Sequence, residues 1–231
     1  VSQGAMNSLN PVARIRTMME DAFRNHESKL SKAELADQIA ELLQRVGLSP
    51  EVADLYPHQL SGGMKQRVCI AIGISLQPKV IIADEPTSAL DVVVQRRVMQ
   101  TLRKVQTELG AAVILIGHDM GVMAQFADRV GVMYAGKLVE DGPVRQIFSR
   151  PQHPYTQLLM ESLPSLESKE SFHREPGGPP SLLNPPSGCV FHPRCPYVMA
   201  RCKVEAPAMR PALAGHLAAC HLLDETKERV A

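Results

Sequence analysis

The sequence contains no tryptophan, few other aromatic residues and no long apolar run. Four Tyr and five Phe bring the aromatic share of the 231 residues to 4%, whereas apolar residues reach 45%. We therefore expect a folded domain with a mainly aliphatic core. The apolar runs, such as those at 80–83 and 111–116, are far shorter than the ~20 residues that a membrane-spanning helix needs. The sequence predicts a soluble, intracellular protein that reaches a membrane only through a partner.

An excess of charge is also absent. Lys and Arg number 25 and Asp and Glu number 24, which leaves a formal net charge of +1. Because proteins that bind nucleic acid usually carry a basic excess, this balance predicts no nucleic-acid partner. The length fits one core domain with an appendage. Val1 stands where an initiator Met would be, and we expect it to mark a fragment or a processed start.

Apolar periodicity predicts that residues 12–48 are helical. The residues that recur there at three- and four-residue spacing are Leu35, Ile39, Leu42, Leu43 and Val46. Ser31 followed by Glu34 is a capping-box pattern, and Gly47 is typical of a helix end. A further helix is expected to start after the glycines at 62–63.

Two continuous apolar runs, at 80–83 and 111–117, are typical of parallel strands that are buried on both faces. A helix is expected between them over 92–109. The segments 129–134 and 137–140 then predict a hairpin. The order of these elements indicates an α/β fold, with helices covering a parallel sheet and a helical subdomain in front of it.

Residues 60–67, Leu-Ser-Gly-Gly-Met-Lys-Gln-Arg, place a serine and two glycines at the start of a helix. Ser61 can cap free N–H groups, while Gly62 and Gly63 allow a phosphate to approach the backbone. Since a helix N-terminus carries partial positive charge, this segment is a candidate anion site. An ordinary glycine-rich helix start is the alternative.

Polar residues follow both predicted strands. Asp84 and Glu85 end the first one, at the sheet edge where open α/β sheets bind ligands. Asp84 can hold Mg²⁺, and Glu85 can act as the base for an attacking water. His118 follows the second strand and can donate to a terminal phosphate. The alternatives are a pair of solvated acids and a structural histidine. Asp91, after the turn at 88–90, is also a candidate helix cap.

Together these segments resemble the ATPase subunits of ABC transporters, whose fold is related to that of the P-loop NTPases. Residues 60–67 match the family signature, 80–86 the Walker B strand, and 88–91 the D-loop. His118 matches the switch histidine, and Gln3 the Q-loop. The resemblance implies Mg²⁺ at Asp84, a catalytic Glu85, and ATP bound between two subunits. The residues it assigns to ATP are Gln3, Ser61, Gly62, Gly63, Gln66, Asp84 and Asp91.

One family element is missing from the sequence. No Gly-x-x-x-x-Gly-Lys-Ser/Thr segment, whose backbone N–H groups and lysine cradle phosphates, occurs in the 231 residues. In the family this loop lies before the Q-loop. We therefore expect a truncated piece of a longer subunit that cannot bind ATP in its own half-site. Such a piece can at most lend its signature helix to an intact partner.

Four of the five cysteines lie in the last 43 residues, at Cys189, Cys195, Cys202 and Cys220. Five, six and seventeen residues separate them, which is looser than the usual spacing of structural zinc ligands. Four thiolates can also hold an iron–sulfur cluster, and free thiols remain a third reading. Because His192, His216 and His221 are spare ligands, zinc stays open. Cys69 is expected in the core.

The tail resembles the C-terminal extension of the oligopeptide/dipeptide ATPases of bacterial importers, through residues 153–156, 182–186 and 189–202. The resemblance implies a four-iron four-sulfur centre held by the four tail cysteines. It divides the chain into a partial nucleotide-binding domain, 1–150, and an extension, 151–231.

The same resemblance implies the setting of the protein. Its expected partners are a second ATPase subunit in a homo- or heterodimer, permease subunits and, indirectly, a solute-binding protein. The expected location is the cytoplasmic face of a bacterial inner membrane. Two other readings remain: a non-transport ABC ATPase, and a non-enzymatic remnant with a metal-binding tail.

Overall fold

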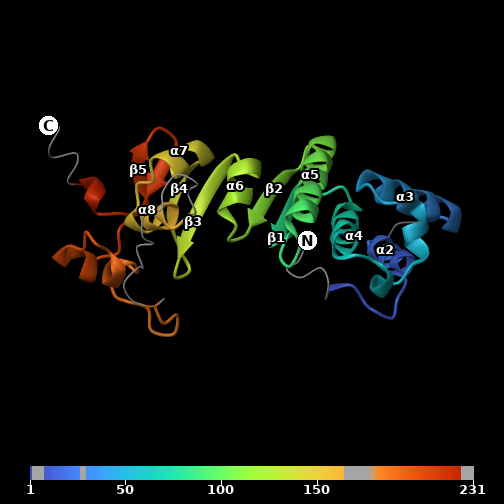
Figure 1. The fold of residues 1–231 in the computed structure, drawn as a ribbon, viewed down its shortest axis with the longest axis horizontal. Helices are drawn as coiled ribbons and strands as arrows, with labels where there is room; N and C mark the ends of the chain where they lie inside the picture. Colours follow the sequence, from blue (N-terminus) through green and yellow to red (C-terminus); the bar gives the residue numbers. More distant parts are fainter. Residues whose placement is uncertain (2–7, 27–29, 164–177, 179, 225–231) are drawn as a thin grey trace. The chain divides into compact units, whose positions relative to one another are not determined.

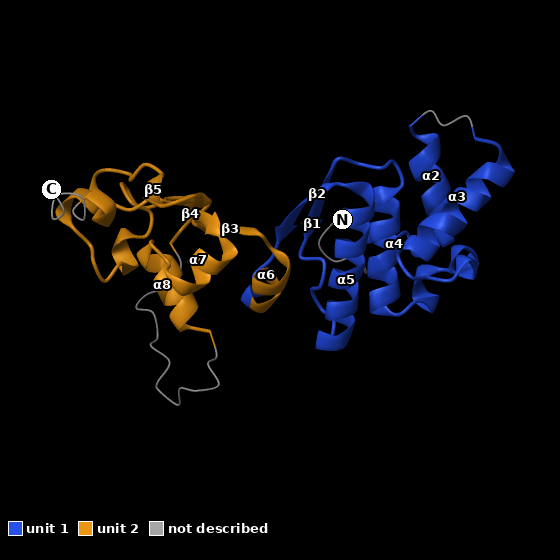
Figure 2. Ribbon diagram, turned by 90° about the horizontal axis from the view of Figure 1, so that it is seen from above, with its two compact units in different colours: residues 1–120 blue, residues 121–231 orange. Residues whose placement is uncertain are grey.

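The computed structural model describes residues 1, 8–26, 30–163, 178 and 180–224. The chain forms two compact units, residues 1–120 and 121–231, which Figure 2 distinguishes by colour. Gln3 and most of the linker expected between residues 165 and 187 lie outside the described residues.

Unit 1 begins with a helical layer. It contains α2 (Ile15–Arg24), α3 (Lys32–Arg45) and α4 (Gly62–Ile74), with short 3-10 turns at Pro50–Asp54 and Pro57–Gln59. The capping box is confirmed, because the Ser31 side chain accepts from the N–H of Glu34 while the Glu34 side chain accepts from the N–H of Ser31. The predicted apolar stripe of α3 is buried.

The parallel strands form as predicted (Figure 1). β1 (Val80–Asp84) pairs with β2 (Ala112–Ile116) in parallel, in a register from Val80 opposite Ala112 to Asp84 opposite Ile116. α5 (Val92–Leu109) connects them and ends at Gly110, whose φ of 62° is left-handed. Val1 lies beside β1: its ammonium group donates to the carbonyl oxygen of Ile82, and its own carbonyl oxygen accepts from the N–H of Asp84.

The prediction that both strands are buried on two faces is wrong for this chain. β1 alternates between exposed and buried residues, and its Val80 and Ile82 are 51% and 54% exposed. Ile114 and Ile116 of β2 are 52% and 47% exposed. The physical reason is that the described residues cover only one face of the pair, whereas a parallel sheet needs layers on both.

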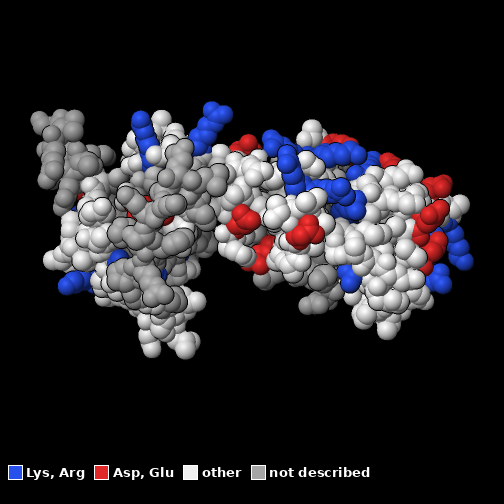
Figure 3. Space-filling model, in the orientation of Figure 1, with Lys and Arg blue, Asp and Glu red and all other residues white. Residues whose placement is uncertain are grey.

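α5 also carries a local concentration of positive charge. Its exposed cationic residues are Arg96, Arg97, Arg103 and Lys104. Lys and Arg side chains gather over this helix in Figure 3. α5 is therefore locally basic, although the net charge of the whole chain is close to zero.

The predicted hairpin opens the sheet of unit 2. β3 (Arg129–Tyr134) pairs with β4 (Lys137–Pro143), and the turn between them has Ala135 and Gly136 at φ of 47° and 74°. Two successive positive φ angles are the mark of a tight hairpin turn whose twist matches that of the strands. α6 (Met120–Phe126) precedes the hairpin, and α7 (Val144–Ser149) and α8 (Pro154–Glu161) follow it.

The C-terminal extension completes this sheet. β5 (Arg210–Leu213) and β6 (His216–Ala218) give an antiparallel sheet in the order β3-β4-β6-β5. The strand predicted to end the first domain thus pairs directly with a strand of the extension. The predicted boundary at residue 150 stays a prediction. No helix in the described part of the chain is long and apolar enough to cross a bilayer.

Candidate functional site

The signature segment lies at the N-terminus of α4. The side chain of Ser61 accepts from the N–H of Met64 at 3.3 Å, so Ser61 caps the helix as predicted. A Cβ atom on Gly63 would lie 2.4 Å from Cγ1 of Val94, and therefore Gly63 is needed for the close approach of α4 and α5. Gln66 is buried, and its Nε2 has no hydrogen-bond partner within the described residues. ATP contacts of Ser61, Gly62, Gly63 and Gln66 stay predictions.

Glu85 and His118 meet at the carboxyl ends of β1 and β2. Nδ1 of His118 lies 3.1 Å from Oε1 of Glu85. The backbone N–H of Glu85 donates to the carbonyl oxygen of Ile116, which fixes the carboxylate beside the end of the neighbouring strand. The Glu85 side chain is 25% exposed and that of His118 is 83% exposed, so a ligand can reach both. Through its two ring nitrogens, His118 can bridge Glu85 and a phosphate oxygen.

The turn after β1 is tied to Glu85. The hydroxyl of Ser88 donates to the carbonyl oxygen of Glu85 at 3.1 Å. Asp91 accepts from the N–H groups of Val93 and Val94 at 3.1 and 3.0 Å, which confirms its capping role. Asp84 ends β1 and is partly exposed. Binding of Mg²⁺ by Asp84 and the catalytic role of Glu85 stay predictions.

The four tail cysteines line one pocket in unit 2. His153, Phe191, His192 and His221 also line it. The N–H of Cys189 donates to the carbonyl oxygen of Cys202 at 2.8 Å. Gly188 makes this approach possible: its φ is 66°, and a Cβ atom there would lie 2.4 Å from that same oxygen. The four tail cysteines, which the sequence predicted to form one group, therefore lie close together in the structure.

Burial controls the chemistry of these thiols. It raises the pKa of the Cys189 and Cys195 thiols and raises the pKa of Cys220 to about 11, with the neighbouring thiols adding to the effect. A bound cation would reverse this preference, since metals hold cysteine as thiolate. Cys69, by contrast, is on α4 and is only partly buried, with its sulfur 3.5 Å from the hydroxyl oxygen of Ser8. The expectation of a fully buried core cysteine is corrected, because Cys69 faces this polar neighbour.

Within the described ranges, no three His, Cys, Asp or Glu side chains are placed to hold one metal ion. A tetrahedral zinc site would require such convergence on a single point. An iron–sulfur cluster makes a different demand, because each cysteine binds a separate iron and the sulfurs stand further apart. The iron–sulfur cluster stays a prediction.

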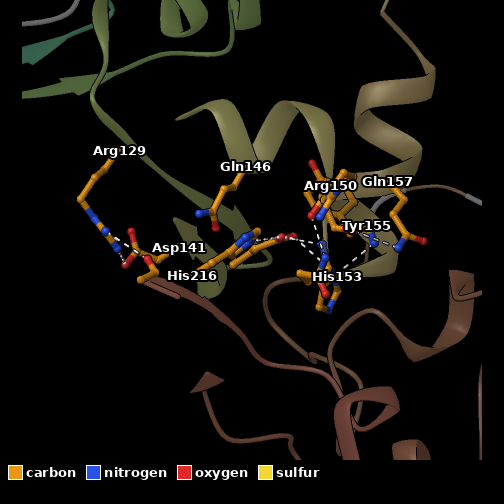
Figure 4. Close-up of polar contacts among 12 residues, drawn as sticks. Arg129, Asp141, Gln146, Arg150, His153, Tyr155, Gln157 and His216 are labelled. Atoms are coloured by element: carbon orange, nitrogen blue, oxygen red, sulfur yellow. Dashed lines mark hydrogen bonds and ion pairs between the residues drawn. The ribbon is translucent and has the colours of Figure 1, made fainter. Parts of the chain in front are cut away.

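The sequence did not predict a polar cluster around Glu140 of β4. Two of its members, His153 and His216, are labelled in Figure 4. The Glu140 side chain is fully buried and accepts from the N–H groups of Gln152 and His153 at 2.6 and 2.9 Å. Nε2 of His216, on β6, lies 2.6 Å from the same carboxylate. Gly142 leaves room for this ring, since a Cβ atom there would lie 2.8 Å from Cδ2 of His216.

The cluster joins β4, the start of α8 and β6, which are far apart in the sequence. The sequence shows Glu140 as a charged residue within a predicted strand. It gives no indication of the partner, His216, which lies 76 residues away. His153 also caps α8, with Nδ1 accepting from the N–H of Tyr155 at 3.1 Å. Burial lowers the pKa of His153 to about 4, so the ring is neutral near pH 7.

Comparisons with known proteins give the family. Residues 4–88 match the family model described as ABC transporter, and residues 139–202 match the one described as oligopeptide/dipeptide transporter, C-terminal region. The dipeptide transport ATP-binding protein DppD of Caldanaerobacter subterraneus is 46% identical over 228 residues, which are 97% of this chain and 70% of that protein. The chain belongs to the oligopeptide/dipeptide family of ABC transporter ATP-binding subunits.

Other family members agree. The oligopeptide transport ATP-binding protein AppF of Bacillus subtilis is 42% identical over 226 residues, 96% of this chain and 68% of its own length. DppD of Escherichia coli is 41% identical over 224 residues, with shares of 96% and 68%.

Solved ABC structures support the fold of this family member. The cbiO1 protein of Clostridium perfringens, described as part of the ABC transporter complex cbiONQ, has a TM-score of 0.56 and 32% identity. The match covers 63% of this chain and 57% of cbiO1. The ATP-binding cassette MJ0796, a dimer bound to ADP and Pi, has a TM-score of 0.54 and 30% identity, with shares of 62% and 61%.

Proposed function

We propose that this chain belongs to an ATPase subunit that couples ATP hydrolysis to the import of di- or oligopeptides, or of a related solute, through a membrane permease. The observation that carries the proposal is the Glu85–His118 pair, 3.1 Å apart at the ends of two parallel strands. A base and a hydrogen-bond donor at that edge suit the attack of water on a terminal phosphate. The peptide-transport names of the relatives supply the solute class.

In the proposed mechanism, Asp84 would hold Mg²⁺, which neutralises phosphate charge when it is bound. Glu85 accepts a proton from the attacking water, and His118 donates to the γ-phosphate. The N-terminus of α4, with Ser61, Gly62 and Gly63, contributes partial positive charge to a nucleotide held by a second ATPase subunit. Gln66, Asp91 and Gln3 are proposed to complete the nucleotide contacts.

The proposed assembly is a homo- or heterodimer of ATPase subunits beneath permease subunits, on the cytoplasmic face of a bacterial inner membrane. The dimeric MJ0796 cassette supports the pairing. A solute-binding protein would act through the permease. No nucleic acid is involved in this proposal.

The decisive experiment measures ATP turnover by the subunit, complete with a phosphate-binding loop and assembled with its permease and partner ATPase. We expect a di- or oligopeptide with its binding protein to stimulate turnover. Recovery of ribosomes or DNA in place of permease subunits would favour a non-transport ABC ATPase. A gene that carries a stop codon upstream of Val1 would favour a non-enzymatic remnant with a metal-binding tail.

We further propose that Cys189, Cys195, Cys202 and Cys220 hold a four-iron four-sulfur cluster. Their common pocket supports this. After anaerobic purification we expect iron and sulfide in equal amounts and visible absorption, lost in Cys202→Ser and kept in Cys69→Ser. One equivalent of zinc without sulfide would overturn the proposal.

A further inference from the structure

The first turns of α5 touch both the signature helix and the loop after β2. Val94 packs against Gly63 so closely that a Cβ atom on the glycine would lie 2.4 Å from Cγ1 of Val94. One residue further, Nε2 of Gln95 donates to Oδ2 of Asp119 at 3.0 Å. Asp91 fixes the start of the same helix by capping it. The first turns of α5 therefore contact both Gly63 of the signature helix and Asp119 after β2, which lie 56 residues apart in the sequence.

Asp119 adjoins His118, the residue that faces Glu85. The His118 side chain is 83% exposed, so few neighbours hold it in place. Its ring is held from one side by the 3.1 Å contact with Glu85. The Gln95–Asp119 hydrogen bond holds the residue that follows His118, in the loop between the end of β2 and the start of α6. This bond joins an amide donor to a carboxylate, a charge-assisted type that is stronger than a bond between neutral groups.

We propose that Gln95 is a positioning residue for ATP hydrolysis, which sets the place of His118 by holding Asp119. The proposal rests on the proposed function of Glu85 and His118.

Substitutions at Gln95 separate this role from packing. Gln95→Glu puts a carboxylate beside Asp119 and replaces attraction with repulsion at nearly unchanged volume. Gln95→Lys keeps a donor and adds an opposite charge. The double variant Gln95→Glu with Asp119→Asn restores a hydrogen bond with donor and acceptor exchanged. Gln100→Ala, an exposed position on the same helix, is the matched control.

Turnover in the assembled transporter gives the first readout. We expect Gln95→Glu to lower turnover roughly tenfold, because the interaction free energy between two contacting residues is often of a size that corresponds to this factor. Gln95→Lys and the double variant should stay within about twofold of the parent, as should Gln100→Ala. Melting temperatures should agree across the set. Equal losses in Gln95→Glu and in the double variant would overturn the proposal.

NMR of the 231-residue chain gives a second readout that needs no ATP. We expect Gln95→Glu to shift the ring signals of His118, which His118→Ala identifies, and Gln100→Ala to leave them in place. Unchanged ring signals in Gln95→Glu would contradict the positioning role whatever the turnover. If instead the signals shift while the assembled parent has no turnover, the proposed function fails and the structural link stands.

Discussion

Glu85 combines an uncommon backbone conformation with a side chain that faces His118. Its φ of 43° is left-handed, which is uncommon for a residue with a side chain, and its carboxylate must face His118. The N–H bond to Ile116 and the hydroxyl of Ser88 on its carbonyl hold it in that conformation. Residues kept in sparsely populated backbone regions by surrounding contacts are concentrated at functional sites.

Glu85→Gln is the direct test of its role as base. The amide has nearly the same shape but accepts no proton, so we expect ATP to bind while hydrolysis slows at least ~100-fold, the usual contribution of a general base. Turnover and nucleotide retention in the assembled transporter measure this. Glu108→Gln, on the exposed end of α5, is the control. Turnover near the parent value would exclude Glu85 as the base.

His153 predicts a pH dependence of stability. Its ring is buried, and desolvation lowers its pKa to about 4, compared with 6.5 in an unfolded chain. Between these values the unfolded chain binds a proton that the folded chain does not. The free energy of unfolding therefore falls as pH drops from 6.5 to 4, by up to about 3 kcal/mol.

Urea unfolding at several pH values checks this. We expect His153→Gln to have a flatter profile than the parent between pH 6.5 and 4. His58→Gln, at an exposed position, should keep the parent slope. An identical slope in His153→Gln would show that other groups control the acid sensitivity.

At the scale of elements, local sequence signals performed well. The Ser31–Glu34 capping box, the left-handed Gly110 and the hairpin turn at Ala135–Gly136 were all predictable, because each depends on neighbours within a few residues. The positions of Glu85 and His118 were predictable for a related reason. Parallel strands present their carboxyl ends at one edge, so residues after each strand meet there.

What depends on distant partners was not predictable. The exposed face of β1 and β2 reflects which layers cover the sheet, and no local pattern encodes that. The pairing of β4 with β6 and the burial of Glu140 join positions 76 residues apart. A buried carboxylate is tolerated here only because three donors surround it, and their identity was invisible in the strand pattern.

Glu140→Ala should be among the most destabilising single changes in unit 2. It leaves the N–H groups of Gln152 and His153 and the ring of His216 without their acceptor. We expect a loss of about 3 kcal/mol in the free energy of unfolding, because each buried group left without its hydrogen-bond partner costs about 1 to 3 kcal/mol. Glu161→Ala, exposed at the end of α8, is the control. A loss below that of the control would mean that the cluster contributes no net stability.

At the scale of the molecule, the chain combines the Glu85–His118 pair at one sheet edge with no Gly-x-x-x-x-Gly-Lys-Ser/Thr segment in its sequence. The curated relatives it matches extend beyond it, since it spans 68–70% of their lengths. Family membership and biochemical capacity are thus separate questions for the 231 residues. The first is answered by identity over nearly the whole chain, and the second depends on a motif that the sequence lacks.

The 231-residue chain on its own should therefore bind ATP only weakly. We expect no saturable binding of Mg-ATP at 1 mM in calorimetry, because the 231-residue sequence has no Gly-x-x-x-x-Gly-Lys-Ser/Thr segment to supply the N–H cradle and the lysine. Fusion of a phosphate-binding loop segment from a relative should restore binding, and the same fusion with its lysine changed to Ala should not. Tight binding by the unmodified chain would contradict this prediction.

The pairing of β4 with β6 also has a consequence for synthesis. A ribosome makes Glu140 76 residues before His216, an interval of roughly 4 to 15 s at usual elongation rates. During that time the Glu140 carboxylate lacks its histidine partner. β4 is then paired only with β3, so its other edge is open. An open strand edge is a template for wrong pairing. The nascent subunit should therefore depend most on chaperones in the seconds before β6 emerges.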